Sequence, residues 1–279
     1  MLSKKLQIIA IFFIIISLCS CHNDKVKNTP AKATGNFEFV VLKAGQADAI
    51  IAKTQNHCII IDCGETDDGD EVVEYLANNS INNVDCLIIT HFDKDHVGGF
   101  PEVANNVSVS NIYVPDYKGN NDEYEMYLKT VQENNLNITT LTEDTNFTFD
   151  DVYLDVSVPK RKSYTEGDND FSLVVSAMHG QNSFLFAADA ESERLSEVLL
   201  EFGTQYDFLK VPHHGKHNSN SKRFINTVKP DYAVITDSDK NPANKKITSY
   251  LQSNGTKIYS TRNGTVNVFS DGLKLNIVQ

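Results

Sequence analysis

The chain has 279 residues, with 25 Lys and Arg against 37 Asp and Glu, and its formal net charge is −12. A protein this acidic does not attract nucleic acid through its overall electrostatic field. Its five cysteines show no CxxC spacing, which argues against a zinc knuckle and against a disulfide framework.

The first 21 residues have the pattern of a bacterial lipoprotein leader. Lys4 and Lys5 precede an apolar run over 6–18, which is shorter than the roughly 20 residues of a membrane span. The run ends in the sequence LCSC, which resembles a lipoprotein cleavage box. The resemblance implies cleavage before Cys21 and a lipid on its sulfur. The alternative is an uncleaved N-terminal anchor.

We therefore expect three segments, which are a signal peptide over 1–20, a tether over 21–36 and one folded domain over 37–279. The tether is polar and has no apolar periodicity, as is typical of a flexible linker. Removal of 1–20 takes away two lysines and changes the formal charge from −12 to −14.

Short β-rich runs alternate with helical patterns along the folded part. In the first half, the sequence predicts strands over 37–42, 49–53, 58–62, 84–90, 111–114 and 152–158, and helices over 70–79, 100–105 and 121–134. In the second half, it predicts strands over 171–178, 183–188, 207–211, 231–236, 256–260, 265–269 and 273–278, and helices over 191–202, 219–228 and 243–253.

Turn signals decide how these strands connect. The dipeptides Asp271-Gly272 and Asn263-Gly264 are typical of antiparallel hairpins, whereas the interleaved helices indicate crossover connections. The combination favours a mixed α/β (α+β) fold, an αββα sandwich of two mixed sheets flanked by helices, over one doubly wound sheet.

The stretch LIITHFDKDHVGG concentrates His91, Asp93, Asp95 and His96 directly after an apolar strand. Imidazole and carboxylate donors that converge at a strand end suit Zn, Mn or Fe better than Ca or Mg. A solvated turn is the alternative for this stretch taken alone. One such cluster has too few ligands for two metals, so further ligands must lie downstream.

The same stretch resembles the first metal motif of the metallo-β-lactamase superfamily, HxHxDH, with Asp93 in place of the second His. Further motifs of that superfamily follow in order. They are GQADAIIA (45–52), IIIDCG (59–64), NDFS (169–172), FLFAADAE (184–191) and LKVPHHGKHNSNS (209–221). Together they are most similar to the hydrolase domain of ComEC-type DNA-uptake proteins. Phosphorylcholine esterases of cell-wall polymers are a related branch.

The resemblance implies a metallo-β-lactamase-like fold with two divalent ions, Zn or Mn. It assigns six ligands, with His91 and Asp93 at site one, Asp95 and His96 at site two, Asp189 bridging both and His214 completing site two. We favour His214 over His213 as the ligand, and expect His213 to contact a ligand or the phosphoryl group.

Three further expectations follow from the resemblance. A third-motif His of the superfamily is missing, and Asp168 or Asp170 can take its place. Oxygen donors at site one favour Mn over Zn, and they leave open that this site is weak or empty. Asp48 and Asp62 are expected to orient ligand side chains from behind.

Two divalent ions can activate a water for in-line attack on a phosphodiester. We expect Asp95 and His213 to be catalytic, with Asp95 accepting or positioning the proton of the water. His213, Lys216 or His217 can offset charge on a phosphoryl oxygen.

The sequence thus predicts a lipid-anchored, extracytoplasmic phosphodiesterase acting on DNA or on a cell-wall polymer. The alternative is a non-catalytic accessory lipoprotein that keeps the fold with an incomplete metal site. β-Lactam hydrolysis is less favoured, because the most similar branch is not the antibiotic-hydrolysing one. Substrate, metal and oligomeric state are left open by the sequence.

Overall fold

Two large β-sheets form the centre of the computed structural model, which describes residue 33 and residues 35–279. The predicted signal peptide and nearly all of the predicted tether lie outside these residues. None of the helices in the described part of the chain is long and apolar enough to span a membrane.

The first sheet has eight strands in the order β17-β16-β1-β2-β3-β5-β7-β8. They are β1 (Phe37–Val41), β2 (Ala49–Lys53), β3 (Cys58–Cys63), β5 (Cys86–Ile88), β7 (Ile112–Pro115), β8 (Ile138–Leu141), β16 (Val266–Ser270) and β17 (Leu275–Val278). Pairing is antiparallel from β17 to β3 and parallel from β3 to β8, so the sheet is mixed.

The second sheet has seven strands in the order β15-β14-β13-β12-β11-β10-β9. They are β9 (Thr145–Phe149), β10 (Val152–Ser157), β11 (Val174–His179), β12 (Asn182–Phe186), β13 (Phe208–Lys210), β14 (Tyr232–Ile235) and β15 (Lys257–Ser260). The strands β12 to β15 run parallel, which brings their carboxyl ends to one edge. A small parallel pair, β4 (Asn83–Val84) and β6 (Ser108–Val109), belongs to neither of these sheets.

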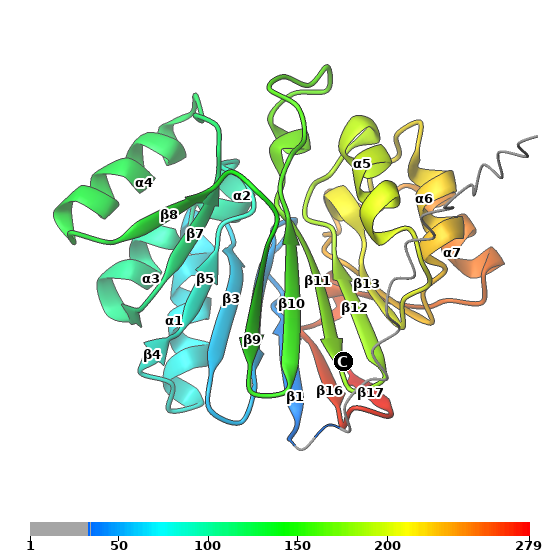
Figure 1. Cartoon of the computed structure of the whole chain (residues 1–279), viewed down its shortest axis with the longest axis horizontal. Helices are drawn as coiled ribbons and strands as arrows, with labels where there is room; N and C mark the ends of the chain where they lie inside the picture. The colour runs from blue at the N-terminus through cyan, green and yellow to red at the C-terminus, as the bar shows by residue number, and fades with distance from the viewer. Residues whose placement is uncertain (1–32, 34) are drawn as a thin grey trace, which may run out of the picture.

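Helices cover the outer face of each sheet (Figure 1). The first sheet packs against α1 (Gly69–Asn78), α3 (Phe100–Asn106) and α4 (Asp122–Glu133), and the second against α5 (Ser192–Phe202), α6 (Ser221–Val228) and α7 (Lys245–Ser253). The short helix α2 (Lys94–Val97) follows β5. Four single turns, η1 (Thr66–Asp68), η2 (Asp168–Phe171), η3 (Pro212–Gly215) and η4 (Thr261–Asn263), complete the elements.

The core between the sheets is aromatic. Phe39 of β1 meets Phe184, Phe186 and Phe208 of the opposite sheet edge to face, with ring centroids 4.9–5.5 Å apart. This geometry is favourable for aromatic pairs, and the full burial of all four rings removes much apolar surface from water. The predicted αββα sandwich of two mixed sheets is therefore confirmed.

Some predicted elements differ from the structure. The strands β8 and β9 were not predicted, because both are only partly buried and rich in Thr. The predicted hairpin at Asn263-Gly264 is wrong: it joins β15 to β16, which belong to different sheets. The hairpin at Asp271-Gly272 is present between β16 and β17.

Candidate metal centre

The candidate ligands come from both sheets and meet where strands end. His91 to His96 follow β5 of the first sheet, Asp189 follows β12, and His214 follows β13 within η3. Because β12 and β13 are parallel neighbours, their following loops leave the same edge of the second sheet. The fold thus brings together residues more than a hundred positions apart.

Four of the predicted ligands form one tight cluster. Asp189 Oδ2 lies 3.0 Å from His214 Nε2, Asp189 Oδ1 lies 3.3 Å from His96 Nε2, and Asp95 Oδ2 lies 3.2 Å from His214 Nε2. One donor atom from each of the four residues lies within 4.8 Å of the others. This is the set predicted for site two.

Several donor atoms of this centre are buried without a hydrogen bond. Among the described residues, they include Nε2 of His91, His96 and His214 and Oδ1 of Asp189. Buried polar atoms are normally paired, because an unpaired one carries a desolvation penalty. Two carboxylates and imidazoles aimed at one point therefore fit a divalent ion.

Asp62 orients His96 through the ring nitrogen that faces away from Asp189. Its Oδ2 lies 2.7 Å from His96 Nδ1, so the carboxylate can accept that proton and leave Nε2 facing Asp189. Thr90 fixes the carboxylate in turn, with its backbone N–H donating to Oδ1 at 2.7 Å and its hydroxyl donating to Oδ2 at 2.6 Å. Such partners set the orientation of a ligand imidazole.

Asp48 orients His214 indirectly, through the hydroxyl group of Thr236. Thr236 Oγ1 donates to Asp48 Oδ1 at 2.8 Å and lies 2.9 Å from His214 Nδ1. The other Asp48 oxygen contacts the ammonium group of Lys210, which also donates to Ala188 O at 3.1 Å. Lys210 is fully buried, and its place at the centre was not predicted from the sequence.

The residues predicted for site one lie beside this cluster. His91 Nε2 is 3.7 Å from Asp93 Oδ2, and the His91 and His96 rings are 4.0 Å apart between centroids. The Asp93 side chain remains 37% exposed. Asp168 of η2 lies close enough for its charge to add to the raised pKa of Asp93. The structure thus leaves Asp168 as a candidate for the missing third-motif ligand.

Asp170 makes contacts to the start of α5. Its Oδ1 accepts the backbone N–H of Glu191 at 2.8 Å and of Arg194 at 3.2 Å, so it caps the start of α5. Its neighbour Asn169 faces the metal centre instead, with Nδ2 3.3 Å from His213 Nε2. Capping accounts for Oδ1 of Asp170, whereas its Oδ2 is buried without a hydrogen bond, so Asp170 also stays a candidate.

His213 lies at the edge of the cluster. Its Nε2 is 3.6 Å from Asp189 Oδ2 and 2.6 Å from Lys216 Nζ, and its Nδ1 is 2.6 Å from Glu191 Oε1. Glu191 therefore orients this imidazole so that Nε2 faces the centre and Lys216. His179, by contrast, is buried in β11 and contacts Ser270, away from the ligands.

The backbone around the centre is strained. Asp62, Ala188, His213 and His214 all have φ between 46° and 59°, in the left-handed region that non-glycine residues rarely adopt. Such conformations persist where the surrounding structure imposes them, and they concentrate at functional sites. Two successive residues in this conformation direct the adjacent rings apart, so that His214 lies within the cluster and His213 lies at its edge.

The charges at the centre are strongly coupled. Burial acts to raise the pKa values of Asp95 and Asp189, but His214 and His96 outweigh it and hold both pKa values well below the usual range. Burial raises the pKa of Asp93 to about 6, with nearby carboxylates adding to the effect. The site-two carboxylates are thus ionised donors at neutral pH.

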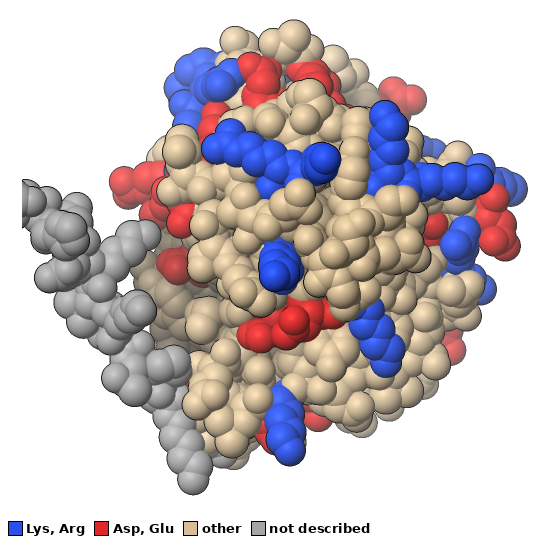
Figure 2. Space-filling model, turned by 90° about the vertical axis from the view of Figure 1, so that its right-hand side faces the viewer, with Lys and Arg blue, Asp and Glu red and all other residues tan. Residues whose placement is uncertain are grey.

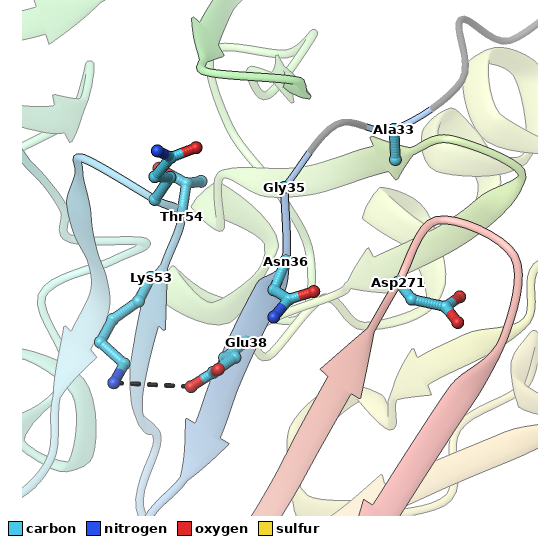
Figure 3. Close-up of a pocket in the computed structure, with 8 residues that line it drawn as sticks. Ala33, Gly35, Asn36, Glu38, Lys53, Thr54 and Asp271 are labelled. Carbon is cyan, nitrogen blue, oxygen red and sulfur yellow. Dashed lines mark ion pairs between the residues drawn. The ribbon is translucent and has the colours of Figure 1, made fainter.

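A surface pocket elsewhere carries no comparable chemistry (Figure 3). It lies by Thr54, beyond the end of β2 that is opposite to Asp48, and its one ion pair joins Lys53 Nζ to Glu38 Oε2 at 3.5 Å. An exposed pair of this kind is a surface feature. Cys21, the predicted lipidation site, lies outside the described residues.

Two curated bacterial proteins are similar to this chain. ComE operon protein 3 of Bacillus subtilis is 26% identical over 200 residues, which are 70% of this chain and 26% of that protein. Recombination protein 2 of Haemophilus influenzae is 26% identical over 211 residues, or 74% of this chain and 25% of that protein. The chain therefore spans about a quarter of the length of these relatives.

Solved structures agree on the fold. One is Igni18, a metallo hydrolase from Ignicoccus hospitalis. The match covers 88% of this chain and 99% of Igni18, with 13% sequence identity and a TM-score of 0.54. Another is the metallo-beta-lactamase fold protein YhfI from Bacillus subtilis. The match covers 82% of this chain and 98% of YhfI, with 11% sequence identity and a TM-score of 0.52. The family model for the metallo-beta-lactamase superfamily matches residues 42–236. The chain belongs to the metallo-beta-lactamase superfamily, as its motifs predicted.

Proposed function

We propose that this protein is a metal-dependent phosphodiesterase that acts outside the cytoplasmic membrane, to which a lipid on Cys21 attaches it. The observation that carries the proposal is the buried cluster of Asp95, His96, Asp189 and His214, whose donor atoms converge and in part have no hydrogen-bond partner. The lipoprotein-like leader supports the location.

The residues present can hold two divalent ions. Asp95, His96, Asp189 and His214 would hold one, and His91, Asp93 and Asp189 would contribute to the other. When bound, such ions lower the pKa of a water and neutralise charge that develops on a phosphoryl oxygen. The oxygen-rich donor set of site one, with His91 as its one imidazole, supports Mn there, and the two imidazoles of site two support Zn or Mn.

The protein's own side chains would do the remaining work. Asp95 is ionised, 23% exposed and held by His214, so it can position a water and accept its proton. Lys216 Nζ, beside His213 Nε2, can offset negative charge on a phosphoryl oxygen. Asp95 is partly exposed and Lys216 is exposed, whereas His96, Asp189 and His214 are buried.

A phosphodiester substrate is supported by two arguments. The two-ion arrangement suits in-line displacement at phosphorus. The similarity to a competence protein, ComA of Neisseria gonorrhoeae, and to the two relatives described above supports DNA, whereas a cell-wall phosphodiester polymer is the second candidate.

The test measures bound metal and turnover of bis-p-nitrophenyl phosphate by the full chain with added Mn or Zn. We expect about two ions per chain, and at least a 100-fold loss of turnover in Asp95→Ala and His214→Ala. Glu133→Gln, an exposed change on α4, is the matched control and should retain both properties. A chain without bound metal and without turnover under either metal would leave the non-catalytic accessory lipoprotein as the better account.

A further inference from the structure

The net charge of the chain conceals a strong asymmetry along the sequence. Residues 37–207 have 9 Lys and Arg against 32 Asp and Glu, whereas residues 208–279 have 11 against 4. The second segment forms α6, α7 and the strands β13, β14 and β15 beside them, and also β16 and β17 of the first sheet. One side of an acidic protein is therefore basic.

This side is the one that carries α6 and α7 (Figure 2). Lys and Arg side chains are distributed over it, with fewer acidic groups, one of which lies near its middle. We define the basic face by six exposed cations of α6, α7 and their flanking loops, which are Lys216, Lys222, Arg223, Lys240, Lys245 and Lys246. Within the described part of the chain, no ion pair to a carboxylate is formed by any of the six.

The loop cations of the acidic part behave differently. Lys160, Arg161 and Lys162 are all paired with carboxylates, as in Arg161 with Glu193 and Lys162 with Asp116. Unpaired cations gathered on one face repel each other, so their arrangement does not serve the stability of the fold. They remain available for an anionic partner.

The helix starts support the same reading. Lys222 and Arg223 lie in the first turn of α6, and Lys245 and Lys246 in the first turn of α7, where neither helix has an acidic residue. The helix dipole disfavours cations at this end. The first turns of α1 and α4 instead carry Asp and Glu, as the dipole favours. A local conflict of this kind indicates a functional requirement.

The basic face begins at the metal centre. Lys216 Nζ is 2.6 Å from His213 Nε2, and the N-cap residue of α7, Asn244, donates its backbone N–H to Gly215 O at 2.9 Å. Both basic helix starts therefore flank the segment that carries the two histidines. A chain bound across them would lead directly to the candidate ligands.

An aromatic side chain lies among the cations. Tyr250 of α7 is half-buried, with Lys222 Nζ 5.9 Å from its ring centroid and its hydroxyl 3.5 Å from His217 Nε2. Cations interleaved with aromatic rings are the pattern of single-strand nucleic-acid sites, in which lysines contact phosphates and bases stack on rings. Tyr250 thus offers a ring on which a base can stack beside cations that can contact phosphates.

We propose that the basic face binds a single strand of nucleic acid and guides it to the metal centre. This inference rests on the proposed function and specifies its substrate class. It also explains how a protein with a net charge of −12 can hold a polyanion, because the acidic remainder repels the strand and leaves one face for it.

The test measures binding of a labelled oligodeoxythymidine to the full chain by fluorescence anisotropy, in EDTA and at several salt concentrations. The variant is Lys222→Glu/Lys245→Glu/Lys246→Glu. The control is Lys118→Glu/Lys129→Glu/Lys274→Glu, which changes the net charge equally at exposed cations elsewhere. The reversals on α6 and α7 place acids where the helix dipole favours them, so the fold should persist.

We expect the variant on the basic face to bind at least tenfold more weakly and the control to bind as the wild type does. The slope of log affinity against log salt should fall by about 2, since each phosphate contact on a single strand contributes about 0.7. Tyr250→Leu should weaken strand binding and leave binding of inorganic polyphosphate unchanged.

Three outcomes would overturn the proposal. In the first, the wild type does not bind the strand. In the second, the two triple variants lose equal affinity for the strand. In the third, the basic face binds phosphatidylglycerol vesicles but does not bind the strand. Because EDTA stops metal-dependent turnover, the binding assay does not depend on hydrolysis. Strand binding without turnover would contradict only the proposed function, and turnover of the small diester without strand binding would contradict only the basic face.

Discussion

Lys210 is the residue whose replacement tests the electrostatics of the metal centre most directly. Its side chain is fully buried in β13, and its ammonium group contacts Asp48 and lies 3.6 Å from Asp189 Oδ1. Burial acts to lower the pKa of Lys210, but the charges of Asp48 and Asp189 outweigh it, and the net pKa is raised. The side chain is therefore a cation at neutral pH.

Lys210→Met keeps the apolar stem and removes the charge. The change leaves two buried carboxylates without their shared cation, and breaking a buried pair from one side costs about 3–5 kcal/mol. We expect that loss in the metal-free protein. Bound divalent ions supply positive charge to Asp189, so the loss should be smaller in the metal-loaded protein.

Urea unfolding at pH 7.5, with EDTA or with added Mn, measures both values. Lys210→Met/Asp48→Asn should recover part of the stability, because it also removes an unpaired carboxylate. Lys53→Met is the control: its pair with Glu38 is 3.5 Å long and partly exposed, and its loss should cost less than about 1 kcal/mol. A metal-free Lys210→Met protein within about 1 kcal/mol of the wild type would refute the reasoning.

Three further predictions concern thiols, pH and metal choice. Cys58, Cys63 and Cys86 are buried free thiols, and burial raises the pKa of Cys58 and of Cys86 to about 12, so iodoacetamide at pH 8 should label the three only after unfolding. Peptide mapping by mass spectrometry checks this, and rapid labelling of the native protein would contradict it. Hydrogen bonds from the neighbouring loop lower the pKa of Asp150 from 3.8 to about 2, so its contribution to stability is present above pH 4 and is lost as the pH falls towards 2. Asp150→Asn should therefore lower the melting temperature at pH 7 but not at pH 2, and an equal shift at both would argue against this assignment. Asp93→His replaces an oxygen donor by nitrogen and should shift metal content from Mn towards Zn in a competition measured by mass spectrometry, whereas unchanged content would mean that Asp93 is not a ligand.

The fold and much of the metal centre could be predicted from the sequence, because the motifs that indicate them are local. His91 to His96 follow one strand within six residues, and the apolar strand pattern before them placed them at a sheet edge. The alternation of helices and strands was likewise readable from periodicity. The polar strand β9, with no fully buried residue, gave no such signal.

Features that depend on distant contacts could not be read in this way. Lys210 follows two apolar residues in β13, and only the approach of Asp48 from the other sheet reveals its burial. Which of His213 and His214 joins the ligand cluster depends on two left-handed backbone conformations, and no residue pattern predicts these. The capping contacts of Asp170 depend on where α5 begins, and the residues around Asp170 do not show this.

The candidate ligands come from two sheets, so a bound ion would join two distant parts of the chain. An ion held by both His96 and His214 closes a chain loop of more than a hundred residues, as a crosslink between distant cysteines would. The three described cysteines are unpaired, so this loop has no covalent equivalent among them. Metal supply would then set resistance to proteolysis, and a chain that lost its ions would be degraded sooner than one that kept them.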